Sequence, residues 1–124
     1  MSPATPDQTP LLLGLDLRDR LVTLVGGGAV TARRARMLLA AGARLRVVSP
    51  VLHPELAELA AGQSVDWLAR RYRGAADLAG CWLVHTATGD PEADAQVARD
   101  AEAARLFCVQ AGRAEEGSAR VPAR

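Results

Sequence analysis

Three consecutive glycines, Gly26, Gly27 and Gly28, are the part of this sequence that points most directly to chemistry. They follow an apolar run at residues 21–25 and precede a long segment rich in alanine, leucine and arginine. Glycine lets a backbone approach a pyrophosphate closely, and the first N–H groups of a following helix point at the anion. The arrangement indicates a dinucleotide site, with a tight strand-to-helix turn that binds no ligand as the alternative.

The glycine loop departs from the dinucleotide fingerprint G-x-G-x-x-G at its last position. Gly26 and Gly28 match the first two glycines, whereas Thr31 stands at the third. The context strengthens the match, because the fingerprint requires a strand before the loop and a helix after it.

The second predicted strand ends without the acidic residue that usually hydrogen-bonds a ribose 2′-hydroxyl. It is followed by Ser49, whose hydroxyl could bond the ribose, and by Pro50 and Val51, whose backbone could line an adenine pocket. Arg44 and Arg46 lie inside the strand, where a clamp on a 2′-phosphate is less natural. The residues therefore favour NAD over NADP only slightly.

The elements that must position these residues alternate along the chain. Short apolar or alternating runs predict strands at residues 21–25, 44–48, 65–69, 82–87 and 106–111. Helical patterns punctuated by proline and glycine predict helices at residues 29–41, 54–62 and 90–104, with a brief one at 75–78. An apolar lead-in at residues 11–17 could form a short edge strand.

This alternation predicts an α/β fold: a Rossmann-like, doubly wound parallel sheet in a single domain, with strand order 3-2-1-4-5. The ligand crevice is expected at the carboxyl ends of the first and fourth strands. We expect a flexible leader at residues 1–10, an NAD-binding domain at 11–112 and a polar tail at 113–124. The first helix is expected to turn one apolar stripe toward the sheet: Val30, Ala35, Met37, Leu38 and Ala41.

Composition excludes several functions. The net charge is +1, so nothing favours nucleic acid or an anionic membrane as a partner. All 15 basic residues are arginine, which excludes Schiff-base lysine chemistry and a Walker-type lysine. No apolar run approaches the length of a membrane span. Cys81 and Cys108 lie in apolar runs without metal-type spacing, so we expect packed thiols in a cytoplasmic protein.

The remaining titratable side chains favour structural roles. His85 lies inside a predicted strand and is expected to be a packed core histidine, and His53 is expected at the start of a helix. Asp90 is well placed to cap the third helix, with Asp94 in the same first turn beside the crevice. The glutamates at residues 115–116 fit a solvated tail. No cluster has a metal-ligand spacing, so no metal site is expected.

Five short segments occur in an order typical of one enzyme family. They are Leu-Asp-Leu-Arg-Asp-Arg at 15–20, Val-Gly-Gly-Gly-Ala-Val at 25–30, Ala-Ala-Gly-Ala-Arg-Leu at 40–45, Ala-Thr-Gly-Asp-Pro at 87–91 and Leu-Phe-Cys at 106–108. On these motifs the chain resembles the precorrin-2 dehydrogenase/sirohydrochlorin ferrochelatase module of sirohaem synthases. The resemblance covers essentially residues 11–122.

The resemblance implies an NAD-dependent oxidoreductase of sirohaem, and hence porphyrin, biosynthesis. The family oxidises precorrin-2 to sirohydrochlorin, and many members then insert ferrous iron. It implies cofactor contacts at Ala29, Val30, Pro50 and Val51, with Ala87 and Thr88 flanking the nicotinamide. In multifunctional members a uroporphyrinogen-III methyltransferase domain follows, so such a methyltransferase is one expected partner. A second copy of the chain is the other.

Two departures from the family pattern bear on activity. The family carries an aspartate just after the fifth strand that is held to act in dehydrogenation and chelation, and here Gly112 stands at that position. The family also continues into a helical dimerisation and tetrapyrrole-binding domain, so residues 113–124 could be a truncated exit to it.

These departures leave three functions open. The first is a precorrin-2 dehydrogenase with unknown catalytic residues. The second is a non-catalytic NAD-binding module or partner subunit of a tetrapyrrole enzyme, and the third is a regulatory NAD-sensing domain. Iron insertion by this chain alone is not expected.

Overall fold

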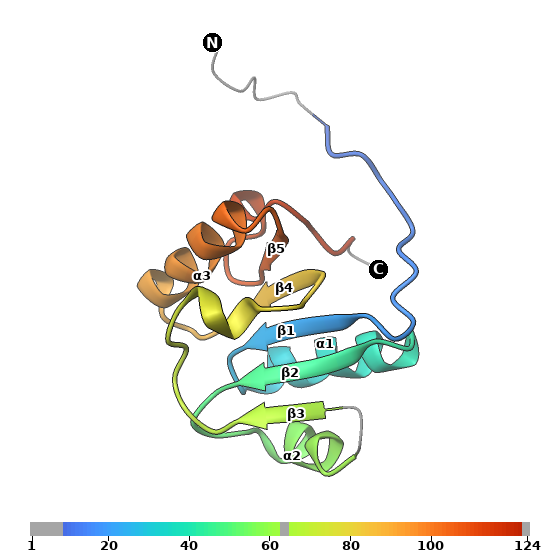
Figure 1. The fold of residues 1–124 in the computed structure, drawn as a ribbon, viewed down its shortest axis with the longest axis vertical. Coiled ribbons are helices and arrows are strands. Elements are labelled where there is room, and N and C mark those ends of the chain that lie inside the picture. The colour runs from blue at the N-terminus through green and yellow to red at the C-terminus, as the bar shows by residue number, and fades with distance from the viewer. Residues whose placement is uncertain (1–8, 63–64, 123–124) are drawn as a thin grey trace.

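A computed structural model describes residues 9–62 and 65–122, and its centre is a parallel sheet (Figure 1). The sheet has five strands in the order β3-β2-β1-β4-β5. Their bounds are β1 (Leu21–Val25), β2 (Arg44–Val48), β3 (Val65–Leu68), β4 (Leu83–Thr86) and β5 (Phe107–Gln110). The predicted fold class and strand order are confirmed. Most of the predicted leader lies outside the described residues.

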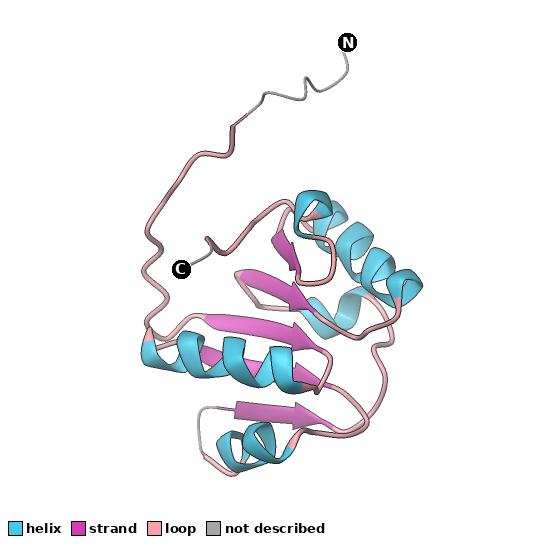
Figure 2. Ribbon diagram, turned by 180° about the vertical axis from the view of Figure 1, so that it is seen from behind, coloured by secondary structure: helices cyan, strands magenta, loops and turns pink. Residues whose placement is uncertain are grey.

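Helices cover both faces of the sheet (Figure 2). Helices α1 (Ala29–Ala40) and α2 (Pro54–Ala60) pack on one face, and α3 (Pro91–Ala103) packs on the other together with the 3₁₀ helix η1 (Ala75–Leu78). A second 3₁₀ helix, η2 (Ala114–Glu116), follows β5 in a stretch where the sequence predicts no regular element. All five predicted strands and all predicted helices are present, with ends shifted by at most two residues.

The apolar core is split by the sheet into two clusters. On the α1 face, strand residues such as Leu24 and Leu45 pack against α1 and against Leu56 of α2. On the α3 face, Val25 and Val84 pack against Leu78, Val97, Ala101 and both free cysteines. The expectation that the two thiols are packed as small apolar groups is confirmed.

The buried stripe of α1 is rotated from its predicted position. Val30 and Met37 are 38% and 44% exposed, and Ala41 lies outside the helix. The residues that α1 buries are Thr31, Ala32, Ala35 and Leu38. The prediction is therefore confirmed for Ala35 and Leu38 and wrong for Val30, Met37 and Ala41, because it counted apolar side chains, whereas α1 also buries the small residues Thr31 and Ala32.

The lead-in at residues 11–17 is not an edge strand. It enters β1, which already pairs with β2 on one side and β4 on the other, so no free edge is within reach. Leu11, Leu12 and Leu13 are 82%, 80% and 69% exposed along an extended segment (Figure 1). Only Leu17, just before β1, packs against the core.

The segment after β5 folds back along the outer edge of the sheet. The Cys108 N–H donates to Ser118 Oγ at 2.8 Å, and the Ala119 N–H donates to the Cys108 carbonyl at 3.1 Å. A side chain at Gly117 would place its Cβ 2.8 Å from that carbonyl, so glycine permits the close approach. Residues 117–119 therefore lie along β5 and occupy the backbone at Cys108.

The crossover from β3 to β4 has only η1 as regular structure and is held by polar side chains. Arg70 donates to the Asp77 carboxylate through Nη1 at 2.9 Å and through Nη2 at 2.6 Å. The Arg73 N–H donates to the same carboxylate at 2.9 Å, and Arg46 donates to the carbonyls of Asp77 and Ala79. Asp77 is 5% exposed, and its hydrogen bonds from Arg70 hold its pKa below the usual 3.8.

Replacing this carboxylate, Asp77→Asn, should lower the free energy of unfolding by about 2 kcal/mol, because Arg70 keeps its charge but loses its partner. The folded-state pKa is depressed, so the stabilisation is present above pH 3.8 and is lost as the pH falls through the folded value. Urea unfolding at neutral and acidic pH measures both effects. The control is Asp66→Asn, which replaces an exposed carboxylate on β3. An equal loss of unfolding free energy in both variants would show that the contacts of Asp77 with Arg70 and Arg73 do not stabilise the crossover.

Candidate functional site

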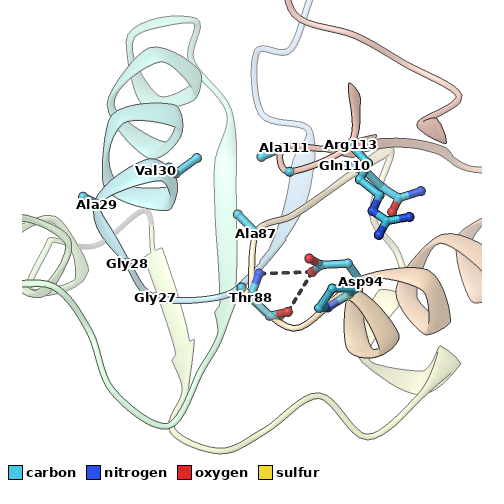
Figure 3. Close-up of a pocket in the computed structure, with 13 residues that line it drawn as sticks. Gly27, Gly28, Ala29, Val30, Ala87, Thr88, Asp94, Gln110, Ala111 and Arg113 are labelled. Atoms are coloured by element: carbon cyan, nitrogen blue, oxygen red, sulfur yellow. Dashed lines mark hydrogen bonds between the residues drawn. The ribbon is translucent and has the colours of Figure 1, made fainter. Parts of the chain in front are cut away.

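A cavity of about 450 Å³ opens at the carboxyl ends of β1, β4 and β5 (Figure 3). It is lined by three segments: the glycine loop with the start of α1, the turn from β4 into α3, and the end of β5. The lining residues are Gly27, Gly28, Ala29, Val30, Ala87, Thr88, Gly89, Pro91, Asp94, Gln110, Ala111, Gly112 and Arg113. The cavity therefore lies where the sequence predicts the ligand crevice.

Two of the three glycines are required by packing alone. Gly26 has a φ of +114°, and an added Cβ would lie 2.3 Å from the Ala87 carbonyl oxygen at the exit of β4. A Cβ on Gly27 would lie 2.0 Å from the Val51 carbonyl oxygen and 2.5 Å from Ser49 Oγ. These glycines let the loop fit between the ends of β2 and β4, whether or not a ligand is present.

Gly28 differs from its two neighbours. Its φ of −89° suits any residue, and an added Cβ would meet no atom within 4 Å. It is the N-cap of α1, without a side-chain cap, and the first turn of α1 contains no acidic residue. The backbone here borders an open space that a side chain would partly fill, which fits the close approach of an anionic ligand.

The other two helices begin in a different way. His53 Nδ1 accepts a hydrogen bond from the Glu55 N–H at 3.2 Å at the start of α2, and Asp90 Oδ1 accepts from the Glu92 N–H at 3.0 Å at the start of α3. Both helices have proline and glutamate in the first turn. The predicted positions of His53 and Asp90 are confirmed. By contrast, the first N–H groups of α1 have no side-chain acceptor, so a bound anion could accept their hydrogen bonds.

The turn between β4 and α3 is organised by one carboxylate oxygen. Asp94 Oδ1 accepts hydrogen bonds from Thr86 Oγ1 at 2.7 Å, Thr88 Oγ1 at 2.8 Å and the Thr88 N–H at 3.0 Å. Asp94 is 9% exposed and lines the cavity. The sequence placed Asp94 beside the crevice but did not reveal this clamp, for which the threonines at 86 and 88 are the only local signal.

The end of β5 forms the far wall of the cavity. Gln110 is 6% exposed and donates through Nε2 to the Glu116 carbonyl at 3.2 Å. Arg113 pairs through Nη1 with Glu116 Oε1, also at 3.2 Å. A Cβ on Gly112 would meet no atom within 4 Å, so this wall has room for a side chain. Sequence reasoning singled out Gly112 here but not Gln110 or Arg113.

The predicted ribose and adenine contacts lie on the β2 side of the glycine loop and do not line this cavity. Ser49 is 7% exposed, and its hydroxyl donates to the Val51 carbonyl at 2.7 Å, whereas Pro50 and Val51 are exposed. The His53 N–H donates to the Gly27 carbonyl at 2.6 Å and ties this segment to the glycine loop. Contacts of these residues with a dinucleotide stay a prediction.

His85 is a core residue. It is 1% exposed, and neither ring nitrogen has a hydrogen-bond partner within the described structure. Burial, with a further contribution from the positive charge of Arg34, lowers its pKa to about 4, so the ring is neutral near pH 7. The prediction of a packed core histidine is confirmed.

Residues 9–62 and 65–122 contain no group of three or more His, Cys, Asp or Glu side chains able to hold a metal ion. Over the same residues, no helix combines the length and the apolar character needed to cross a membrane.

Comparison with known proteins identifies the type of domain. A family described as putative NAD(P)-binding matches residues 13–123. Siroheme synthase 3 of Aeromonas hydrophila subsp. hydrophila is 50% identical over 101 residues, which are 82% of this chain and 21% of that protein. The siroheme synthase of Chromobacterium violaceum is 52% identical over 89 residues, or 72% of this chain and 19% of that protein. The chain thus spans about a fifth of the length of these relatives.

Two solved structures resemble the fold. The structure of SirC, precorrin-2 dehydrogenase, matches with a TM-score of 0.78 and 26% identity, over 92% of this chain and 55% of that chain. A UDP-glucose dehydrogenase from Pyrobaculum islandicum matches with a TM-score of 0.54 and 26% identity, over 76% of this chain and 22% of that chain.

The parallel sheet, the glycine loop and the uncapped α1 together define a Rossmann-type nucleotide-binding domain. The chain belongs to the putative NAD(P)-binding family, and its resemblance to the precorrin-2 dehydrogenase module of sirohaem synthases is confirmed. A nicotinamide cofactor fits the open backbone at Gly28 and the uncapped helix beside it.

Because His85 is buried in its neutral form, the free energy of unfolding depends on pH in a specific way. As the pH falls, the unfolded chain takes up a proton near pH 6.5 before the folded chain does near pH 4, so stability declines across this interval by about 3 kcal/mol. Urea unfolding of His85→Leu should remove this decline. His53→Asn keeps a capping residue on α2 and should retain it. A decline of full size in His85→Leu would show that other groups cause it.

The open position of Gly28 allows stability and binding to be separated. In Gly28→Ser, the hydroxyl can cap α1, so the free energy of unfolding should stay equal or rise by up to about 0.5 kcal/mol. The side chain also occupies the anion space, and NAD affinity measured by calorimetry should fall at least about tenfold. Gly14→Ser, equally open but in the lead-in, is the control. Unchanged affinity in Gly28→Ser would contradict the anion site.

Proposed function

We propose that this chain binds NAD in the crevice and serves the oxidation of precorrin-2 to sirohydrochlorin in sirohaem biosynthesis. The observation that carries the proposal is the start of α1, which has no side-chain cap and borders an open space at Gly28 beside the cavity. The likeness to siroheme synthases and to SirC, precorrin-2 dehydrogenase, supports the choice of substrate.

Different residues of the crevice would contact different parts of the dinucleotide. The backbone of Gly28 and the amides of Ala29 and Val30 would hold the pyrophosphate, with Gly26 and Gly27 shaping the loop. Ala87 and Thr88 would flank the nicotinamide, and the segment of Ser49, Pro50 and Val51 would face the adenosine. Residues 49–52 contain no cationic side chain to bind a 2′-phosphate, which supports NAD over NADP.

When bound, NAD supplies the hydride acceptor, and the overall reaction converts precorrin-2 and NAD⁺ to sirohydrochlorin, NADH and a proton. The chain's own contribution is to hold the two reactants together. Gly112 stands on the cavity wall where the family has an aspartate, and it has no side chain to accept a proton. Loss of such a group typically slows a reaction by a factor of about 100 to 10,000.

Gly112 also supports the second candidate, a non-catalytic NAD-binding module. Such a module would act with a partner that supplies the missing group, such as a uroporphyrinogen-III methyltransferase or a second copy of the chain. Both candidates would act in the cytoplasm, which the two free, buried cysteines support. Iron insertion is not part of either proposal.

Turnover distinguishes the two candidates. The purified chain is incubated with precorrin-2 and NAD, and sirohydrochlorin is followed by its absorbance. In Gly112→Asp we expect a gain of about 100-fold or more over the wild type, because the open position accepts a side chain beside the cavity. Gly112→Asn is the matched control and should give no gain.

Each result favours one candidate. Measurable turnover by the wild type supports the dehydrogenase. Calorimetric binding of NAD without turnover by the wild type supports the non-catalytic module, and turnover restored only in Gly112→Asp favours the same reading. If the wild type fails to bind NAD or NADH, both candidates are wrong.

A further inference from the structure

Asp94 brings a negative charge to the cavity. Of the residues that line the cavity, Asp94 and Arg113 have side chains that are charged at neutral pH. Arg113 is 56% exposed and already paired with Glu116, so solvent and its partner offset its charge. Asp94 is 9% exposed, and none of the described residues forms an ion pair with it. Its charge is therefore less screened than that of Arg113.

The two oxygens of this carboxylate are in different situations. Oδ1 accepts three hydrogen bonds, from Thr86 and Thr88, which prevent the side chain from rotating away. No described residue donates to Oδ2, yet Oδ2 is not among the buried polar atoms that lack a partner. Oδ2 is therefore not fully buried, and Asp94 lines the cavity, where Figure 3 shows its carboxylate directed toward Thr88. The threonines fix the direction in which the charge is presented.

The position of this charge along a bound dinucleotide follows from the fold. The start of α1 takes the pyrophosphate, and the adenosine extends toward β2, as in other folds of this type. The cavity lies on the opposite side, over β4 and β5. The nicotinamide half therefore occupies the side on which Asp94 lies.

The nicotinamide ring carries a positive charge in NAD⁺ and none in NADH, whereas the rest of the molecule is the same. A fixed carboxylate near the ring attracts the oxidised form and has no such attraction for the reduced form. We propose that Asp94 makes the site selective for the oxidation state of the nucleotide, so that NAD⁺ binds more tightly than NADH. This inference rests on the proposed binding of NAD and adds to it the residue that sets the preference.

The test compares three ligands and three proteins by calorimetry at neutral pH. The ligands are NAD⁺, NADH and ADP-ribose, which has the pyrophosphate and adenosine but no nicotinamide ring. The proteins are the wild type, Asp94→Asn and Asp90→Asn. Asparagine at 94 keeps an oxygen that can accept the threonine hydrogen bonds and removes the charge. Asp90→Asn removes a nearby exposed charge outside the cavity lining and keeps a capping residue.

The wild type and Asp90→Asn should prefer NAD⁺. In Asp94→Asn the affinity for NAD⁺ should fall about tenfold, with the affinities for NADH and ADP-ribose nearly unchanged. The ratio of the affinity for NAD⁺ to the affinity for NADH then falls by the same factor. This pattern separates charge from structure, because a loosened turn would weaken NAD⁺ and NADH alike.

The other outcomes overturn the inference in distinguishable ways. A wild type that binds both nucleotides equally or prefers NADH refutes it and leaves the NAD site standing. An unchanged ratio in Asp94→Asn, or parallel weakening of both nucleotides, does the same and leaves Asp94 a purely structural role. If the wild type binds none of the three ligands, the proposed function fails, and the inference fails with it.

Discussion

The close approach of the glycine loop to the exits of β2 and β4 is the constraint on which the site depends. Gly26 passes the Ala87 carbonyl, and Gly27 passes the Val51 carbonyl, at distances that no Cβ could tolerate. This contact sets where α1 begins and ties the β4–α3 turn to the loop. Because the exits of β2 and β4 hold the loop in place, Gly28 can border open space although no side chain caps the helix there.

The fold could be predicted from the sequence because its signals are local. A parallel strand covered on both faces must be short and apolar, and such runs alternate here with helical patterns. Features that depend on neighbours were missed. The lead-in at residues 11–17 has strand-like composition, but the strand that it enters, β1, is already paired on both sides. The contact between α1 and the sheet also buries small residues, which a hydrophobic pattern undervalues.

Only part of the site could be predicted, because some of its features are local in the sequence and others depend on tertiary contacts. Glycines before a helix are visible in any sequence, so the anion-binding end of the crevice was identified. The clamp on Asp94 joins the end of a strand to a helix eight residues away, and aspartate in a first helical turn ordinarily indicates helix stabilisation. Gln110 ends β5, and Arg113 lies in the short connection from β5 to η2, so both reach the cavity through the position of this edge strand beside β4. Such roles arise from the tertiary arrangement and have no pattern in the sequence.

The folding back of residues 117–119 along β5 has a consequence for assembly. An open sheet edge invites pairing with a strand from another molecule, and natural proteins suppress this by covering the edge. Here the backbone at Cys108 is already occupied by Ser118 and Ala119. A partner that extended this sheet by one strand would have to displace those residues at β5 or add alongside β3, far from the crevice. Association through strand pairing is thereby directed away from the wall that contains Gly112.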